Sequence, residues 1–289
     1  MDLNYGKIYT WGEGQLAEAG IEEAGLDARL LLEHACGTDR NTLLVHSEKE
    51  VSEKEYECYV NYISARKKHV PLQYITGVQE FMGLEFLVDK NVLIPRQDTE
   101  ILVEEVMRHL HDGMRILDMC TGSGCILLSL LYYSNDCSGI GIDISNEALS
   151  AASKNAEKLK LQKPELRVDF IQGDLFEQLE KKHLGQFEII VSNPPYIKSG
   201  VIETLMEEVR EYEPRLALDG KEDGLFFYRK IIEQAGDYLS GGGGLFFEIG
   251  CEQAADVRLM MEAAGYTDVQ VVKDFAGLDR VVHGILNKS

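Results

Sequence analysis

The spacing of apolar residues is helical over the first seventy positions. Within Tyr56–Ile63, apolar side chains recur at i, i+3, i+4 and i+7, which places them on one face of a helix. Ser52 and Glu55 have the spacing of a capping box at the start of that helix. Earlier, Asp27 is a possible cap of a helix that Gly37 ends. We therefore predict a small helical domain over residues 1–72.

After Pro71 the pattern of apolar residues changes from helical spacing to short extended runs. Two extended runs within Tyr74–Val88 flank Met82-Gly83, a pattern typical of a β-hairpin. The segment Ile94–Glu100 then leads into a helix, with Asp98 as a possible cap. We predict that residues 73–96 form a hairpin linker between two domains.

From Arg115 onward, extended runs alternate with helical ones, which predicts a third region, a domain over residues 97–289. Helices are expected at Asn146–Leu159 and Leu225–Leu239, and the Gly241–Gly244 run is interpreted as a turn before the fifth strand. Alternating strands and helices predict an α/β fold with a mostly parallel sheet. The gap around Gly277 is too short for a helical crossover, so the last two strands should pair antiparallel. Strands are expected at 115–119, 138–144, 166–172, 187–192, 243–249, 268–274 and 280–286.

Composition narrows the class of protein. The formal net charge of −20 disfavours nucleic-acid binding through many phosphate contacts, because such binding needs clustered Lys and Arg. The six cysteines form no Cys-x-x-Cys pair and no histidine accompanies them at metal-ligand spacing, so reduced thiols and no metal site are expected. No signal peptide is visible and no apolar run approaches the roughly 20 residues of a membrane span. We expect a soluble, cytoplasmic protein with no membrane contact; the sequence favours a monomer but does not decide the oligomeric state.

The first candidate site follows the strand at 115–119. There the residues Cys120, Thr121, Gly122, Ser123 and Gly124 form a glycine-bearing turn before a helix. Glycines let the backbone approach a ligand with its amides free to donate hydrogen bonds. Alone, the turn is equally compatible with a structural strand-to-helix connection. The full dehydrogenase glycine spacing and the lysine of a P-loop are both absent.

One acidic residue stands at the end of the next expected strand, and another follows the strand after that. Asp143 stands where a carboxylate can accept hydrogen bonds from both hydroxyls of a ribose. The competing interpretation is a helix cap, although Ser145 already suits that role. Asp174 either faces an adenine amino group or caps a helix, and the sequence does not decide between these two roles.

The loop after the fourth strand is the most specific motif. It reads Ser192-Asn193-Pro194-Pro195-Tyr196-Ile197. Pro194 and Pro195 stiffen the loop at the carboxyl edge of the sheet, where open α/β folds bind ligands. Asn193 offers a side-chain carbonyl and Pro194 a backbone carbonyl, while Tyr196 offers a flat face for stacking. Together these three groups suit a planar NH2 group.

Asn-Pro-Pro-Tyr downstream of the glycine motif resembles the class I amino-methyltransferases. Within that group, the chain resembles the HemK/PrmC family of release factor glutamine methyltransferases over nearly its whole length. The more specific segments of the resemblance lie outside the cofactor motifs and number four: Pro71–Gly77, Phe81–Gly83, Ile94–Glu100 and Glu213–Leu218. The family usually has glycine where this chain has Cys120, whose side chain must point away from the cofactor or narrow its pocket.

This resemblance implies a seven-stranded, Rossmann-like methyltransferase sheet with an antiparallel last strand. It implies S-adenosylmethionine as cofactor, lying over Cys120–Gly124 with Asp143 on the ribose, Leu175 and Asp174 at the adenine and Asn193 near the methyl group. It also implies a protein substrate, the glutamine of the Gly-Gly-Gln motif of peptide chain release factors, recognised by the helical domain and the hairpin. The enzyme would methylate the side-chain amide nitrogen.

Three other functions are weighed against this one. A DNA or RNA amino-methyltransferase shares the Asn193–Tyr196 loop but fits poorly with the charge of −20. A non-enzymatic adaptor with a vestigial fold is disfavoured by the intact loop. A dehydrogenase is disfavoured by the glycine spacing and by the terminal hairpin.

Overall fold

The computed structural model describes residues 3–182 and 185–288, which form two compact units. The helical unit comprises the chain up to Val78 together with Met206–Tyr212, and the sheet unit comprises Gln79–Leu205 and the chain from Glu213 onward. The chain therefore passes between the units three times. The division at residues 72 and 96 expected from the sequence stays a prediction.

The helical unit is built from short amphipathic helices. Their buried faces enclose a core around Leu16, Leu31 and Tyr59, whose hydroxyl donates to the Ala28 carbonyl across 3.1 Å. Gly37 ends the second helix in the left-handed conformation, as predicted. The helices are α1 (Tyr5–Glu18), α2 (Ala24–Cys36), α3 (Arg40–Val45), α4 (Glu53–Arg66), α5 (Leu72–Thr76) and α10 (Glu207–Tyr212).

The capping box of Ser52 and Glu55 is confirmed at the start of α4. The expected cap at Asp27 is wrong, because α2 begins at Ala24 and Asp27 lies buried in its first turn. Its carboxylate instead contacts Arg66, with Nε and Oδ2 2.6 Å apart. Nη2 of Arg66 lies 2.6 Å from the carboxylate of Glu208, which ties α10 into this unit.

The predicted hairpin is confirmed as β1 (Val78–Phe81) and β2 (Leu84–Leu87), joined at Met82-Gly83. Its expected start at Tyr74 is wrong, because Leu72–Thr76 form α5. The next helix, α6 (Gln97–His109), has Arg96 as its N-terminal cap position. Asp98 is therefore not the cap; it lies in the first turn and pairs with Arg280 across 3.0 Å.

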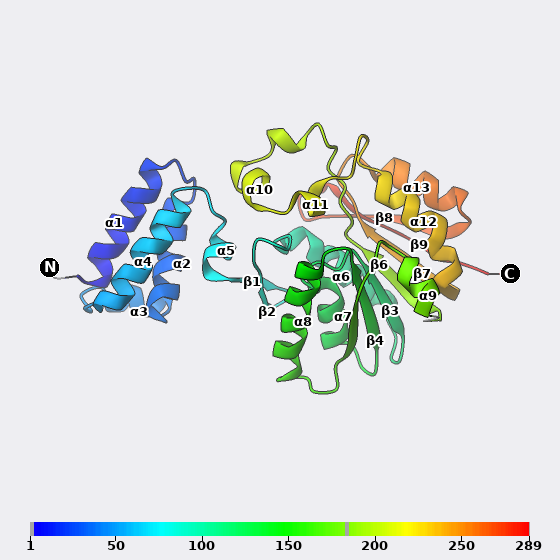
Figure 1. The fold of residues 1–289 in the computed structure, drawn as a ribbon, viewed down its shortest axis with the longest axis horizontal. Coiled ribbons are helices and arrows are strands. Elements are labelled where there is room, and N and C mark those ends of the chain that lie inside the picture. Colours follow the sequence, from blue (N-terminus) through cyan, green and yellow to red (C-terminus); the bar gives the residue numbers. More distant parts are fainter. Residues whose placement is uncertain (1–2, 183–184, 289) are drawn as a thin grey trace. The chain divides into compact units, whose positions relative to one another are not determined.

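The sheet unit contains a seven-stranded sheet in the order β5-β4-β3-β6-β7-β9-β8, with β9 antiparallel to both of its neighbours (Figure 1). The antiparallel pairing of the last two strands is thus confirmed. The strands are β3 (Arg115–Met119), β4 (Ser138–Asp143), β5 (Arg167–Gln172), β6 (Phe187–Ser192), β7 (Leu239–Glu248), β8 (Tyr266–Lys273) and β9 (Asp279–Leu286).

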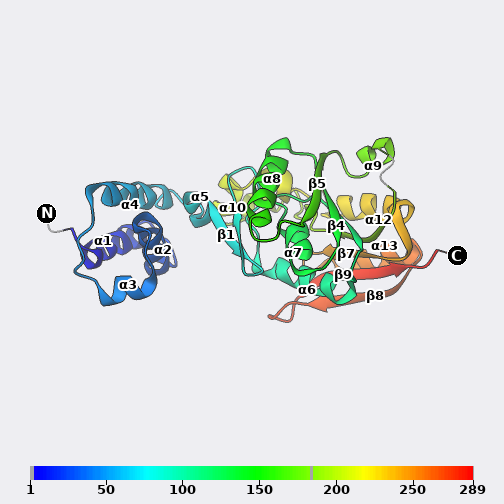
Figure 2. The same ribbon diagram turned by 90° about the horizontal axis from the view of Figure 1, so that it is seen from below.

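Helices cover both faces of this sheet, which makes the unit a three-layer α/β fold (Figure 2). One face packs against α6, α7 (Cys125–Tyr133) and α8 (Asn146–Lys160), and the other against α9 (Glu177–Lys182), α12 (Phe226–Tyr238) and α13 (Ala254–Ala263). Two short helices, η1 (Ile202–Thr204) and α11 (Arg215–Leu218), lie between β6 and α12. No helix in the described ranges is long and apolar enough to cross a membrane.

The glycine run Gly241–Gly244 differs from its prediction. It lies within β7 rather than in a turn before it. Phe187 of β6 pairs with Leu239, but Ile189 pairs with Gly244. The register therefore shifts between these two pairs, and the intervening residues of β7, which include the glycines, interrupt the regular pairing. A run without side chains allows this departure, and periodicity does not reveal it.

The strand order positions the site. From β3 the chain builds one side of the sheet through β4 and β5, then returns to place β6 on the other side of β3. The carboxyl ends of β3 and β6 therefore flank the point where the winding direction reverses. Open α/β sheets bind ligands at this point, and the segments Cys120–Gly124 and Asn193–Tyr196 both begin there.

Candidate active site

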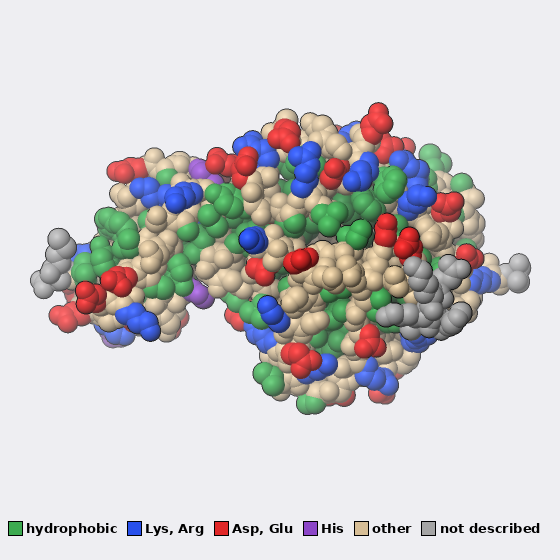
Figure 3. Space-filling view, in the orientation of Figure 1, with side chains coloured by type: hydrophobic (Ala, Val, Ile, Leu, Met, Phe, Trp, Pro, Cys, Tyr) green, Lys and Arg blue, Asp and Glu red, His purple; other side chains and the backbone are tan. Residues whose placement is uncertain are grey.

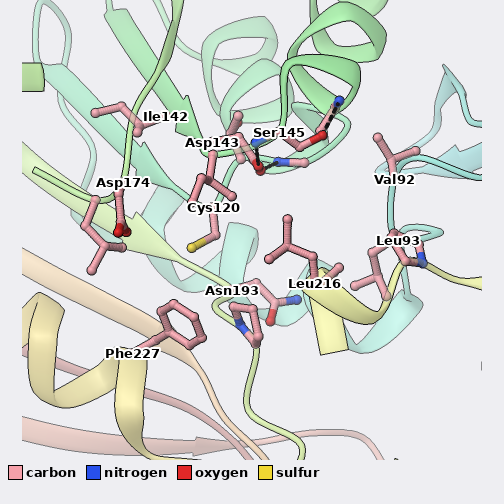
Figure 4. A pocket seen from close by; sticks show the side chains of 18 of the residues that line it. Val92, Leu93, Cys120, Ile142, Asp143, Ser145, Asp174, Asn193, Leu216 and Phe227 are labelled. Atoms are coloured by element: carbon pink, nitrogen blue, oxygen red, sulfur yellow. Dashed lines mark hydrogen bonds between the residues drawn. The ribbon is translucent and has the colours of Figure 1, made fainter. Parts of the chain in front are cut away.

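A cavity of about 320 Å³ lies at this edge of the sheet. Its lining brings together nine residues predicted from the sequence as site residues, which lie at the ends of four different strands: Cys120, Thr121, Gly122, Ser123, Asp143, Asp174, Leu175, Asn193 and Pro195. Figure 4 shows Asp143, Cys120 and Asn193 around the same space. Small-molecule sites are concave, largely apolar and carry a few converging polar groups, and this cavity has that character.

Asp143 is held in place through both carboxylate oxygens. Oδ2 accepts a hydrogen bond from the Gly122 amide and Oδ1 accepts one from the Ser145 amide, each across 2.9 Å. Burial raises the pKa of Asp143, and these amides counteract that rise. The cap of α8 is Ser145, whose hydroxyl accepts from the Ala148 amide. Each Asp143 oxygen keeps lone pairs for a further donor in the cavity.

Cys120 occupies a backbone conformation that favours glycine. Its φ is +61°, in the left-handed region that costs an ordinary side chain roughly 1–2 kcal/mol. Its thiol points into the cavity (Figure 4), so this side chain narrows the pocket rather than pointing away from it. Burial, followed by the nearby carboxylate of Asp143, raises the pKa of this thiol, which keeps it protonated.

Gly124 does not line the cavity. It caps α7 at φ +78°, and a Cβ there would lie 3.1 Å from Leu128 and 3.2 Å from Ala152. Gly124 therefore serves the close packing of α7 and α8 beneath the turn. At the base of the turn, the Thr121 hydroxyl donates to the fully buried carboxylate of Asp118 across 2.7 Å. Burial raises the pKa of Asp118 to about 7.

Asp174 and Leu175 both line the cavity. Asp174 is exposed, and its backbone carbonyl accepts from the Glu177 amide across 3.3 Å. Leu175 has a φ of +49° and is half-buried against the apolar cluster under α12. The two interpretations of Asp174, adenine contact and cap, both remain predictions.

The loop after β6 is anchored at both ends. The Asn193 side-chain amide donates to the Thr99 hydroxyl across 3.4 Å, and the Tyr196 hydroxyl donates to Glu248 Oε1 across 3.2 Å. Burial raises the pKa of Glu248, and hydrogen bonds from Thr99 and Tyr196 oppose that rise. Glu248, buried at the end of β7, thus supports both ends of the loop.

Asn193 and Pro195 line the cavity, whereas Pro194 is buried and Tyr196 packs partly into the core. Because the Asn193 amide nitrogen faces Thr99, its oxygen Oδ1 is the group that this side chain offers to a donor in the cavity. Burial raises the pKa of Tyr196, so its hydroxyl stays protonated. The stacking role expected for Tyr196 stays a prediction.

A second segment presses against this loop. Gly220 comes so close that a Cβ would lie 2.7 Å from the Tyr196 backbone, and a Cβ on Gly224 would lie 2.4 Å from the Tyr196 carbonyl oxygen. Gln253 donates from Nε2 to that carbonyl and to the Gly224 carbonyl, each across 3.1 Å. Two glycines and one glutamine therefore fix the position of the loop backbone.

Several lining residues were missed by the sequence reasoning. Pro214, Leu216 and Ala217 lie in the Glu213–Leu218 segment, whose sequence indicated the resemblance to the family but no role in the cavity. Phe226 and Phe227 begin α12, and Asn91, Val92 and Leu93 follow β2. Because these segments are apolar and distant in the sequence, only the folded chain shows that they meet at one cavity.

Comparisons with known proteins agree with this geometry. A family model described as the PrmC N-terminal domain matches residues 7–77, and one described as a methyltransferase domain matches residues 110–280. The chain is 43% identical to a release factor glutamine methyltransferase of Geobacter sulfurreducens, covering 96% of this chain and 95% of the relative. It is also 43% identical to one from Clostridium acetobutylicum, covering 89% of each.

A solved structure supports the fold alone. The crystal structure of a methyltransferase from Pyrococcus furiosus superposes with a TM-score of 0.53 at 18% identity, covering 72% of this chain and 91% of that one. The seven-stranded sheet with its antiparallel strand is therefore a known methyltransferase architecture.

Proposed function

Because this chain belongs to the family of release factor glutamine methyltransferases, we propose that it transfers a methyl group from S-adenosylmethionine to the side-chain amide nitrogen of a glutamine in the Gly-Gly-Gln motif of peptide chain release factors. The observation that carries the proposal is the orientation of Asn193. Its nitrogen faces Thr99, which leaves a carbonyl oxygen for the NH2 group of a substrate.

The residues of the cavity fit the cofactor. Asp143 presents two anchored oxygens with spare lone pairs for the ribose hydroxyls, and Gly122 has open space where a side chain would stand. Leu175 and Phe227 supply apolar surface for the adenine. When bound, the cofactor supplies an electrophilic methyl group on a sulfonium centre.

The chain must make an amide nitrogen reactive, and such a nitrogen is a poor nucleophile because its lone pair is delocalised into the carbonyl. In this proposal, Asn193 Oδ1 and the Pro194 carbonyl each accept one N–H of the substrate. These acceptors stabilise positive charge that develops on nitrogen in the transition state. The methylated nitrogen then loses one of its N–H protons to solvent, since a protonated N-methyl amide is a strong acid. Tyr196 holds the planar amide, and Pro195 stiffens the loop. Positioning of this kind can supply roughly 7–11 kcal/mol of barrier lowering without a strong base.

Recognition of a protein partner is assigned to the helical domain and the hairpin. The net charge of −20 is unsuited to gripping nucleic acid through phosphates. In the face shown in Figure 3, basic side chains are interspersed with acidic ones across the described residues. This distribution supports a protein substrate rather than a direct nucleic-acid contact.

The test is methyl transfer to a purified release factor, followed by mass spectrometry of the peptide that contains Gly-Gly-Gln. With a labelled methyl donor, one methyl group should appear on the glutamine. Asn193→Ala should lower turnover by about 10²–10³-fold, the range for losing one group that stabilises transition-state charge. Its circular dichroism spectrum should match the original protein. Full turnover by Asn193→Ala, or methyl transfer to another residue, would contradict the proposal.

A further inference from the structure

Three side chains that the proposed reaction does not use meet on the sheet face covered by α6. Glu105 and His109 lie one turn apart on α6, and His283 lies in the middle of β9. Glu105 Oε1 is 3.3 Å from Nε2 of His109 and 3.3 Å from Nε2 of His283. One ligand atom from each of the three residues lies within 4.8 Å of the other two.

Burial makes this arrangement costly unless the groups have a partner. The side chains of Glu105 and His283 are only 7% and 2% exposed, while His109 is 34% exposed and opens the cluster to solvent. Both ring nitrogens of His283 lack a hydrogen bond among the described residues. Buried polar groups are otherwise almost always hydrogen-bonded, so His283 calls for a partner that the described chain does not supply.

The contact between Glu105 and His283 is close but poorly aligned. Its 3.3 Å separation is short enough for a hydrogen bond, yet the direction of Nε2 does not satisfy one. Ligands that converge on a shared ion have this relationship, because their lone pairs point toward the ion rather than toward each other. Tetrahedral zinc with bonds of about 2.0–2.1 Å holds its ligand atoms roughly 3.3–3.4 Å apart, which matches both contacts of Glu105. The contact with His109 also has the geometry of a hydrogen bond, which the ion would replace, and the two imidazoles would close on the ion from a separation of up to 4.8 Å.

The surroundings favour the ligand forms of these groups. Imidazoles that bind metal are held in one orientation by their neighbours. The ring of His283 is stacked on Phe246, with centroids 5.0 Å apart and planes 9° apart, so its orientation is fixed. The other oxygen of Glu105 accepts from Arg108, as ligating carboxylates commonly do from a neighbouring donor.

We propose that Glu105, His109 and His283 bind one Zn²⁺ ion, with water as the fourth ligand on the open side of His109. The ion fastens the end of α6 to β9. The start of α6 is already joined to β9 by the Asp98–Arg280 pair. Because Nδ1 of His283 has no supporting acceptor among the described residues, the affinity should be weaker than that of a site with all its outer partners.

The experiment uses the full chain after treatment with a chelator, titrated with Co²⁺ and then with Zn²⁺. We expect one equivalent of Co²⁺ with the absorption of a tetrahedral site and without the intense thiolate band that any of the six cysteines would give. Zn²⁺ should displace it and raise the melting temperature. His283→Gln and His109→Gln should each weaken binding at least tenfold. His111 is an exposed histidine two residues beyond α6, and His111→Gln is the matched control. This variant should bind Co²⁺ as tightly as the unsubstituted protein does.

Three outcomes would overturn the proposal: failure of the original protein to bind one equivalent, a thiolate spectrum, or unchanged binding in both histidine variants. The first and last would mean that the three residues share a proton network instead of an ion. If His283→Gln does not fold, His109→Gln decides, because His109 is half-exposed at the helix end and its replacement leaves the core intact.

Discussion

The Asn193 amide nitrogen donates a hydrogen bond to the hydroxyl of Thr99 across 3.4 Å. Thr99 is 2% exposed and lies in the first turn of α6, within the Ile94–Glu100 segment. An asparagine side chain has two nearly isosteric orientations. In this arrangement Thr99 selects the one that presents oxygen to the cavity, and it is therefore a positioning residue for Asn193.

Thr99→Val should lower kcat about tenfold with little change in KM, because the loss of one oriented hydrogen bond costs about 1 kcal/mol. Valine keeps the shape but cannot accept from the Asn193 amide. Thr99→Ser keeps the hydroxyl and should restore most of the rate. Steady-state kinetics on a release factor measure both variants. Equal loss in the serine and valine variants would show that Thr99 only fills space.

Asp143→Ala should weaken S-adenosylmethionine binding by roughly 1–3 kcal/mol, the range for a charge-assisted hydrogen bond. Ser145→Ala removes the cap of α8 instead and should lower the free energy of unfolding by about 0.5–2 kcal/mol. The cofactor affinity of that variant should change little. Titration calorimetry and urea unfolding separate the two effects. An unchanged dissociation constant in Asp143→Ala would leave Asp143 as a support of the turn only.

Gly220→Ala should reduce kcat by one to two orders of magnitude (~10–100-fold), since displacing a positioned group by about 1 Å can cost 10²-fold. The new Cβ would lie 2.7 Å from the Tyr196 backbone, so that backbone must shift. Gly200→Ala is the matched control, because a Cβ there meets nothing within 4 Å. If both variants turn over alike, the approach of Gly220 to the loop is not needed for catalysis.

Asp118 should make stability depend on pH. Its pKa is about 7 in the folded protein against an ordinary 3.8, so the native state keeps a proton that the unfolded chain releases between these values. The free energy of unfolding should therefore fall as pH rises through this window, and the loss should be complete above pH 7. Relative to Asp118→Asn, the original protein should lose on the order of 2 kcal/mol between pH 5 and pH 8.

Urea unfolding of both proteins at the two pH values measures this difference. Asp237→Asn removes the same charge from an exposed position and should follow the original protein at both pH values. Parallel stability curves for the original protein and Asp118→Asn would contradict the raised pKa.

The sequence predicted the sheet well because most of its strands are short runs rich in apolar residues that alternate with helical segments. The glycine run within β7 was misplaced, since an irregular strand without side chains has no periodic signal. Asp27 and Asp98 were both expected to be caps, yet both form ion pairs with distant arginines. A carboxylate near a helix start suits either role, and only tertiary contacts decide between them.

Motifs at strand ends located the cavity, because parallel strands bring their carboxyl ends to one edge. Its supporting residues were not visible. Thr99, Glu248 and Gln253 act on Asn193 or Tyr196 from segments far away in the sequence. Likewise, the Glu105 and His109 spacing on α6 gains meaning only when β9 brings His283 beside it.

The membership of α10 in the helical unit bears on how the protein is made. Arg66 and its second carboxylate partner, Glu208, are separated by 142 residues. A ribosome that adds about 5–20 residues per second needs on the order of ten seconds to bridge that interval. Throughout this interval Arg66 can contact Asp27 and the Val70 carbonyl but not yet Glu208. The helical unit emerges first and is completed only when a later segment has been made. In a stalled or shortened nascent chain, α10 is missing and Arg66 lacks Glu208. The surface that α10 would cover should then be accessible to chaperones and proteases, although the chain up to Val78 has been made.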